Sequence, residues 1–153
     1  MKIALFPGSF DPITIAHVDI LKRALPLFDK IVVGIGLNSS KQGFLPAEKR
    51  KEIVETVFKG INSVEVQTYE GLTVDFCKKI GANFMVRGVR SVSDFEYEKA
   101  IAQINQTMMP QMETIILLSK PEYSAISSTI VRDILRHHGD VTPFLPVEAL
   151  SLL

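Results

Sequence analysis

Short apolar runs alternate along the chain with stretches whose apolar residues recur at helical spacing. The apolar runs predict five strands, at 3–6, 30–37, 64–66, 83–86 and 114–118. The helical stretches span 14–28, 46–60, 74–80, 92–108, 127–136 and a short segment from 146. Strands that are apolar on both faces and alternate with helices are typical of a parallel sheet covered on both sides. We therefore expect an α/β fold in a single domain, residues 1–153, with a Rossmann-like, open, parallel five-stranded sheet and helices on both faces.

Residues with strong positional preferences mark several helix ends. Thr14 is the predicted N-cap of the first helix. Pro46 is predicted to begin the helix 46–60, at a position where its missing N–H costs no hydrogen bond, and Gly81 is predicted to end the helix 74–80. The lone cysteine, Cys77, falls within the apolar pattern of that helix, so we expect it in the core. Four apolar side chains share one face of the long helix 92–108, namely Tyr97, Ile101, Ile104 and Met108.

The charge balance and the cysteine count narrow the possible partners. Seventeen basic and 17 acidic side chains leave no net charge, which argues against electrostatic binding to nucleic acid but allows a local cationic pocket. One cysteine excludes an intrachain disulfide framework, and no histidine cluster predicts a metal site. The start of the chain shows no signal-peptide pattern, and no apolar run approaches membrane-spanning length. We therefore expect a cytoplasmic protein with no nucleic-acid or membrane partner.

Polar segments follow each predicted strand. In open parallel sheets, ligands bind beyond the C-terminal ends of the strands, so these segments should meet at one edge of the sheet. They carry Ser9, Lys41, Thr73, Arg87 with Arg90, and the residues from Tyr123 to Thr129. That edge is the predicted ligand site.

The segment 6–17 gives the strongest chemical signal. A strand, a loop with Gly8 and two prolines, and a helix N-terminus with His17 are typical of a phosphate-binding corner. Thr14 and His17 lie three residues apart, so both can point the same way from the first turn. An ordinary strand–helix turn with a surface histidine produces the same pattern, so this stretch alone leaves both interpretations open.

Three further features suit a phosphate ligand. Arg87 and Arg90 can make bidentate contacts, the helix start at 127–129 offers free N–H groups and hydroxyls, and Lys41 can add a point charge. Exposed arginines, plain serine capping and a solvated lysine are the alternatives for the same residues. Glu98 lies too far along its helix to serve the dipole, and periodicity gives it no other role. The chain has no GxxxxGK[ST] loop, which argues against a P-loop phosphotransferase.

Four segments in order, at 7–17, 87–90, 94–98 and 126–132, carry a family resemblance. The first resembles the nucleotidyltransferase signature with a T/H-x-G-H core. Together, and over most of the chain, they closely resemble the bacterial phosphopantetheine adenylyltransferase family, which implies a nucleotidyltransferase-type, dinucleotide-binding fold. Ala16 departs from the pattern, because family members usually carry glycine there. Its methyl group would lower ATP affinity if the nucleotide packed tightly against that backbone.

The resemblance implies a reaction of ATP with 4′-phosphopantetheine that gives dephospho-coenzyme A and pyrophosphate, the penultimate step of coenzyme A biosynthesis. The acceptor phosphate is itself an anionic nucleophile, so in-line attack needs no covalent enzyme intermediate. The resemblance also implies Mg²⁺ carried in with ATP, no dedicated protein metal site, and a homohexamer.

The resemblance assigns roles to individual residues. His17 would stabilise the transition state, with Lys41 and Arg90 as further catalytic residues. The residues that would bind phosphopantetheine are Ser9, Lys41, Thr73 and Arg87. Those that would hold ATP are Ser9, Phe10, His17, Gly88, Val89, Arg90, Glu98, Tyr123, Ser124, Ala125, Ile126, Ser127, Ser128 and Thr129.

Two other functions stay open on the sequence. Small nucleotidyltransferases that act on nicotinamide mononucleotide or glycerol 3-phosphate share the signature and the final helix motif, although the Lys41 loop and the run 94–98 favour phosphopantetheine. A nucleotide-binding sensor without catalysis is the alternative from a different class, suggested by Ala16. The retention of His17 and of both arginines argues against it.

Overall fold

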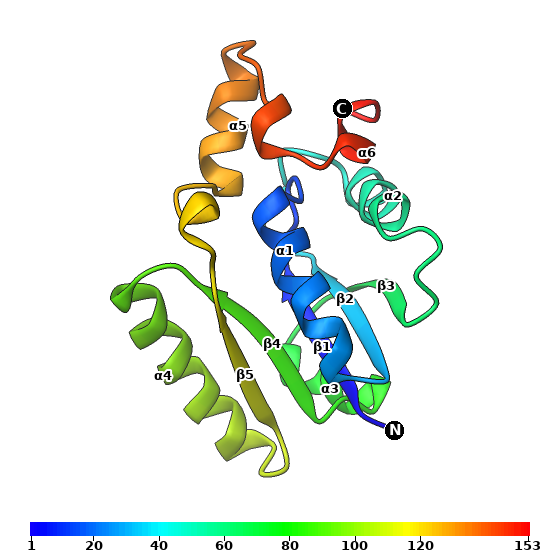
Figure 1. Ribbon diagram of the computed structural model, residues 1–153. Helices are drawn as coiled ribbons and strands as arrows, with labels where there is room; N and C mark the ends of the chain where they lie inside the picture. The colour runs from blue at the N-terminus through cyan, green and yellow to red at the C-terminus, as the bar shows by residue number, and fades with distance from the viewer.

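A computed structural model describes residues 1–153, and its five strands form a single parallel sheet (Figure 1). The strands are β1 (Ile3–Gly8), β2 (Lys30–Gly36), β3 (Val64–Tyr69), β4 (Phe84–Val89) and β5 (Glu113–Leu118), in the order β3-β2-β1-β4-β5. Every neighbouring pair is parallel. The prediction of an open, parallel, five-stranded α/β fold is therefore confirmed.

Helices cover both faces of this sheet, as predicted. They are α1 (Ile15–Ala24), α2 (Ala47–Val57), α3 (Thr73–Ile80), α4 (Val92–Met108), α5 (Ser128–Arg136) and α6 (Val147–Leu150). Ala4 and Phe6 of β1 enter a core shared with α1, α2, α5 and α6, whereas Leu5 points to the opposite face and enters a second core that includes Cys77 of α3. In Figure 1, α1 lies in front of the sheet and α3 behind it.

The chain order creates a split in the middle of the sheet. After β3 the chain crosses back to place β4 on the other side of β1. β1 pairs with β2 along its whole length, from Ile3 to Gly8, but with β4 only at Ala4 and Leu5. The C-terminal ends of β1 and β4 consequently separate, and a crevice at such a topological switch point is where open α/β sheets bind ligands.

Most helix ends match the sequence predictions, and the exceptions have local causes. The Thr14 side chain caps α1, α4 has the predicted bounds, and Gly81 ends α3 in the left-handed region with φ 71°. The first helix was expected to continue to Phe28, but it ends at Ala24 because Pro26 turns the next three residues into a 3-10 turn, Leu25–Leu27.

Three strands continue past their predicted C-terminal ends, and the first of them, β1, runs to Gly8 in register with β2. β3 continues to Tyr69, in register with β2, and β4 continues to Val89, in register with β5. Arg87 was expected in the loop after its strand, and it lies instead within β4, where Arg87 pairs with Ile116. The glycine beside it suggested a loop, but pairing with β5 keeps that stretch extended.

The apolar stripe of α4 lies outward rather than in the core. Tyr97 is 68% exposed, Ile104 62% and Met108 42%. The buried side chains of α4 are the polar ones, Glu98 and Asn105. The fourth side chain of this face, Ile101, is half-buried, and the rest of the face remains accessible.

Candidate active site

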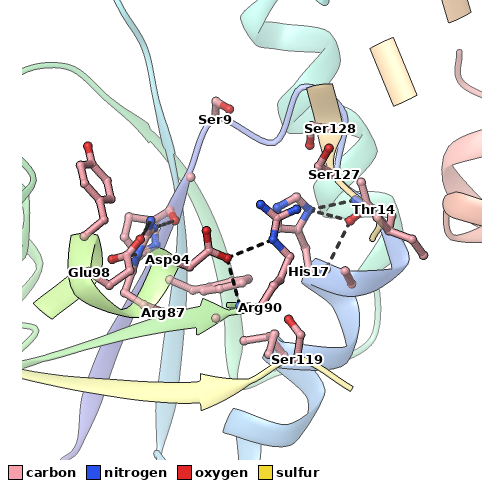
Figure 2. Close-up of a pocket in the computed structure, with 18 residues that line it drawn as sticks. Ser9, Thr14, His17, Arg87, Arg90, Asp94, Glu98, Ser119, Ser127 and Ser128 are labelled. Carbon is pink, nitrogen blue, oxygen red and sulfur yellow. Dashed lines mark hydrogen bonds and ion pairs between the residues drawn. The ribbon is translucent and has the colours of Figure 1, made fainter. Parts of the chain in front are cut away.

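A cavity of about 340 Å³ lies at the split between β1 and β4. Its walls are the C-terminal ends of these two strands and the N-terminal turns of α1, α4 and α5. Figure 2 shows the polar side chains that converge on it from these elements, with Arg87 and Glu98 at one side, Arg90 and Asp94 in the middle, and His17, Thr14 and the serines of α5 at the other side. The predicted meeting of polar segments at one sheet edge is thus confirmed for the segments that carry Ser9, Arg87 with Arg90, and Ile126 to Ser128, and α4 joins them.

His17 is held by the cap of its own helix. Thr14 and His17 form a reciprocal capping box, in which the backbone N–H of Thr14 donates to His17 Nδ1 at 3.0 Å. The Phe10 ring packs edge-on against the imidazole, with ring centroids 5.1 Å apart. Burial, followed by the nearby guanidinium groups of Arg87 and Arg90, lowers the pKa of His17 to about 4.

These contacts determine which hydrogen-bonding groups His17 presents. At neutral pH the imidazole is uncharged and carries one ring proton. Because Nδ1 accepts a backbone N–H, that proton resides on Nε2. His17 therefore offers an uncharged Nε2–H donor at the cavity that it lines.

Arg87 is fixed by three hydrogen bonds. Its Nε and Nη2 donate to the two carboxylate oxygens of Glu98 at 2.8 and 2.7 Å, and its Nη1 donates to the carbonyl oxygen of Pro7 at 2.7 Å. The bond to Pro7 spans the split between β4 and β1. A guanidinium has five N–H donors, so one N–H on each Nη is left for a ligand.

Arg90 is held differently, by a carboxylate one helical turn away. Asp94 accepts both the backbone N–H and the Nε–H of Arg90, at 3.0 and 3.1 Å. Burial raises the pKa of Asp94, but the hydrogen bonds and the charge of Arg90 outweigh it and leave that pKa below its ordinary value. Asp94 thus stays ionised and orients the guanidinium at the cavity.

The N-terminus of α5 forms the opposite wall. Ser127 is the N-cap, and its hydroxyl accepts the N–H of Ile130 at 3.2 Å. Ser128 donates from its hydroxyl to the carbonyl oxygen of Pro12 at 2.8 Å, which attaches this helix start to the first loop. The unpaired N–H groups of the first turn and the helix dipole favour an anion here.

A second cavity, of about 270 Å³, adjoins the first. The two cavities share Pro7, Gly8, Arg87 and Glu98, so the Arg87–Glu98 ion pair belongs to both. Half of the residues that line the second cavity are hydrophobic, and its polar groups include Asn105 and Thr73, whose hydroxyl lies 2.9 Å from the Tyr69 hydroxyl. A cavity whose lining is half apolar and which ends at a fixed guanidinium suits a long, largely uncharged ligand with an anionic end.

The structure brings many of the predicted site residues together. Those that line the first cavity are Ser9, His17, Arg87, Gly88, Arg90, Glu98, Ile126, Ser127 and Ser128, and Thr73 lines the second. Those outside both linings are Phe10, Lys41, Val89, Tyr123, Ser124, Ala125 and Thr129. Phe10 is buried beneath His17, and Lys41 is exposed on the loop between β2 and α2. The ligand roles of all these residues stay predictions.

Sequence reasoning missed several partners of the site residues. It did not pair Asp94 with Arg90, and it gave Glu98 no structural role, although Glu98 pairs with Arg87. It did not single out Asn105, nor the buried charges of Asp11 and Arg50. A polar residue at a helical position that should be apolar was the only available signal, and Asn105 carries it.

Ala16, where a glycine was expected from the resemblance, lies in the first turn of α1. Helical backbone accommodates alanine without strain, so this departure leaves the fold of the loop intact. Its methyl group lines the first cavity.

The structure contains neither a membrane-spanning helix nor a cluster of potential metal ligands. None of the helices combines the length and the apolar character that crossing a membrane requires. Three or more His, Cys, Asp or Glu side chains nowhere gather in a way that could hold a metal ion.

Comparison with known proteins places this geometry among nucleotidyltransferases. The cytidylyltransferase-like family model matches residues 5–134. Phosphopantetheine adenylyltransferases of Flavobacterium psychrophilum and Flavobacterium johnsoniae are 50% and 51% identical over 146 residues, which cover 95% of this chain and 96% and 95% of those proteins. A bifunctional NMN adenylyltransferase/ADP ribose pyrophosphatase from Francisella tularensis superposes with a TM-score of 0.74 at 15% identity, over 94% of this chain and 44% of that chain, and shows the same fold.

Proposed function

This chain belongs to the phosphopantetheine adenylyltransferase family of cytidylyltransferase-like proteins, and we propose that its two adjoining cavities hold the two substrates of that reaction. The enzyme transfers AMP from ATP to 4′-phosphopantetheine, and the products are dephospho-coenzyme A and pyrophosphate. The observation that carries the substrate assignment is the shared Arg87–Glu98 wall. It places a fixed guanidinium between the polar cavity and the apolar one.

ATP occupies the first cavity in this proposal. The α5 N-terminus, with Ser127 and Ser128, receives the outer phosphates, because its dipole and free N–H groups favour negative charge. Arg90, oriented by Asp94, adds a cation on the opposite side. The adenosine end then lies toward β4 and the start of α4, near Gly88 and Glu98.

Phosphopantetheine occupies the second cavity, with its phosphate toward the first. The apolar lining suits the pantetheine arm, and Asn105 and Thr73 can hydrogen-bond to its amides. The remaining two N–H groups of Arg87 can take two oxygens of the phosphate. Ser9 and Lys41 would complete the phosphate contacts.

Bond formation follows from this arrangement. An oxygen of the acceptor phosphate attacks the α-phosphorus of ATP in line with the bond to the bridging oxygen. The new P–O bond forms as that bond breaks, and its electron pair leaves with pyrophosphate. Because the nucleophile is already an anion, no general base is needed. His17 donates its Nε2–H to the α-phosphate, where charge develops in the transition state.

Magnesium enters this proposal as a companion of ATP rather than as a resident ion. The two carboxylates at the cavity, Asp94 and Glu98, are occupied by the arginines, which leaves the triphosphate oxygens as the natural ligands. When bound there, Mg²⁺ neutralises charge on the phosphates. We also propose the cytoplasm as the compartment, because both substrates are charged metabolites that must come from an aqueous pool.

A homohexamer is the assembly that the family resemblance implies, and the exposed face of α4 supports self-association. Three large apolar side chains share one face of α4, namely Tyr97, Ile104 and Met108, and are between 42% and 68% exposed. Contiguous apolar patches of this kind are typical of protein interfaces.

The experiment that tests the function is pyrophosphate release with ATP and 4′-phosphopantetheine, with the product identified by mass. We expect dephospho-coenzyme A from the wild type. Nicotinamide mononucleotide and glycerol 3-phosphate serve as competing acceptors in parallel assays. Preferential turnover of either one, by folded protein, would overturn the assignment of the second cavity.

A further inference from the structure

Two buried charged residues near the site have no part in the chemistry described above. Asp11 is 6% exposed and Arg50 is 7% exposed, and neither lines a cavity of the site. Burial of a charge is costly unless hydrogen bonds replace its lost water, so the partners of these two groups indicate what they do.

The carboxylate of Asp11 binds the end of the loop that carries Lys41. We call residues 38–45 the Lys41 loop, which joins β2 to α2. Oδ2 of Asp11 accepts the backbone N–H of Phe44 and Oδ1 accepts that of Leu45, both at 2.8 Å. Both oxygens of one side chain thus hold two successive peptide groups of a loop more than 30 residues away.

Arg50 completes the attachment from α2. Its Nε donates to the carbonyl oxygen of Leu45 at 3.1 Å, and its Nη1 donates to the carbonyl oxygen of Ser9 at 3.1 Å. One guanidinium therefore joins the Lys41 loop to the segment that carries Ser9. A Cβ atom on Gly43 would lie only 2.8 Å from Asp11 Oδ2 and 3.1 Å from Arg50 Nη2, so the loop can approach this closely only with glycine there.

The same first loop is attached to α5 through backbone atoms. Arg132 of α5 donates to the carbonyl oxygen of Asp11 at 3.0 Å, and Ser128 donates to that of Pro12 at 2.8 Å. The Lys41 loop, the segment that carries Ser9 and the start of α5 therefore meet around Asp11. Of these, only the Lys41 loop is attached to the side chain of Asp11.

From this geometry we infer that Asp11 and Arg50 are positioning residues that fix the Lys41 loop relative to Ser9, so that both segments present their phosphate ligands to the acceptor. The inference rests on the proposed function. Lys41 is exposed and reaches neither cavity lining by itself, so the placement of its loop decides how often the ammonium meets the acceptor phosphate. Misplacement of a binding group by about 1 Å can cost about 10²-fold in rate.

The test is a double-mutant cycle between Asp11→Asn and Lys41→Ala, read out as kcat/KM for phosphopantetheine. Asparagine retains one acceptor oxygen and replaces the other with an NH₂ group, so one of the two loop bonds is lost. We expect each single variant to lose about 10- to 10²-fold, and the double variant to lose no more than Lys41→Ala alone. We expect KM for ATP to change less than about twofold, because the α5 attachments use carbonyl oxygens that asparagine keeps. Losses that multiply in the double variant, or an equal rise in the KM for ATP, would overturn the inference.

Two further variants serve as a second probe and a control. Gly43→Ala keeps both charged residues but forces the loop off the Asp11 carboxylate, so it should reproduce the Asp11→Asn profile even if the latter folds poorly. Asp19→Asn makes the same chemical change at a partly buried carboxylate, which pairs with Arg23 and Lys120, and should leave kcat/KM unchanged. Equal losses in Asp19→Asn and Asp11→Asn would show a general effect of destabilisation and reject the positioning role.

Amide hydrogen exchange tests the geometry without turnover. The N–H groups of Phe44 and Leu45 should exchange at least tenfold faster in Asp11→Asn than in the wild type, while that of Ile130 in α5 should not change. If the wild type forms no dephospho-coenzyme A but exchange is faster in Asp11→Asn as expected, the proposed function is rejected and the attachment of the loop by Asp11 still stands. An active wild type with unaltered exchange in Asp11→Asn would reject the inference alone.

Discussion

The backbone N–H of Thr14 points at Nδ1 of His17 from 3.0 Å, and this bond settles which ring nitrogen carries the proton at the cavity. The capping box of α1 thus has two effects: it satisfies backbone N–H groups at the start of the helix, and it selects the imidazole tautomer. Through this bond, Thr14, which sequence rules place at a helix start, also determines which hydrogen-bonding group His17 presents at the cavity.

Replacement of His17 by alanine should reduce kcat by about 10²- to 10³-fold, the usual effect of losing one preorganised donor to developing charge. Folding should persist, since the cap loses only one of its two reciprocal bonds. Steady-state kinetics and circular dichroism of the two proteins check this prediction. A folded variant with the wild-type rate would remove His17 from the mechanism.

The activity should not depend on His17 titration between about pH 5.5 and 9. Because the pKa of His17 is lowered to about 4, the imidazole is already uncharged throughout that range. The acid limb that belongs to His17 should therefore appear only below about pH 5. A log(kcat/KM) profile that falls with a midpoint near the ordinary histidine value, and loses that midpoint in His17→Gln, would contradict this assignment.

Stability should carry a related signature. The pKa of His17 is about 4 in the folded chain and 6.5 as the ordinary value, so the unfolded state binds more protons between these pH values. The free energy of unfolding should therefore rise with pH from about 4 to 6.5, and this contribution is lost as the pH falls. His17→Gln retains the capping-box pattern and removes the titration. Urea unfolding at pH 4.5 and 7 should show a smaller pH difference in that variant than in the wild type.

Removal of the charge on Glu98 should weaken both the fold and acceptor binding. Glutamine cannot accept both N–H groups of Arg87, so we expect Glu98→Gln to lower the free energy of unfolding by about 1–2 kcal/mol and to raise the KM for phosphopantetheine. Glu96→Gln is the matched control on the same helix, at an exposed site, and should change neither quantity. Equal effects in the two variants would show that only the net charge matters.

Ala16→Gly should restore the residue expected from the family and change ATP affinity only modestly. Position 16 is helical, so glycine gives no conformational advantage there and should cost up to about 1 kcal/mol of stability. Thermal unfolding and the KM for ATP measure the two effects. A large gain in ATP affinity would show instead that the methyl group obstructs the nucleotide.

The apolar face of α4 should govern self-association. Ile104→Lys places a charge in the centre of the exposed stripe, where Ile104 is 62% exposed, and should dissociate the proposed homohexamer into smaller species without unfolding them. Light scattering after size exclusion gives the mass of each protein. Gln106→Lys is the control, because it adds the same charge at an exposed polar position of the same helix, away from the apolar face, and should leave the mass unchanged. A wild type that is monomeric at all concentrations would remove the assembly from the proposal.

Local signals in the sequence were sufficient for much of the fold. Thr14, Pro46 and Gly81 each act within one turn of the helix they bound, and the apolar runs of β1 and β2 are buried on both faces. The candidate site followed from a topological rule, because the C-terminal ends of parallel strands share one edge. This rule alone was enough to predict that His17, Arg90 and Ser127 lie at the same edge of the sheet.

Contacts between distant residues could not be predicted in the same way. β4 continues past Gly88 because β5 pairs with it, and Glu98 is buried in α4 because Arg87 of the neighbouring strand requires a carboxylate. The sequence around Asp11 is typical of a loop, and nothing in it indicates that the Lys41 loop binds to this side chain. The outward stripe of α4 has the spacing of a core face, and periodicity alone does not state what covers it.

The short pairing of β1 with β4 has a consequence for the order of assembly. Leu5 faces Met85 across that seam, so the contact closes a loop of about 80 residues, whereas β1, β2 and β3 lie consecutively along the chain. Contacts that close long loops form late, because the chain must lose more conformational entropy before such a contact can stabilise it. A nascent polypeptide can therefore build β1, α1 and the capped His17 well before Arg87 exists opposite them. Nucleotide binding would then report a late stage of folding, since the cleft also needs α5, whose bond from Ser128 to Pro12 joins residues 116 positions apart.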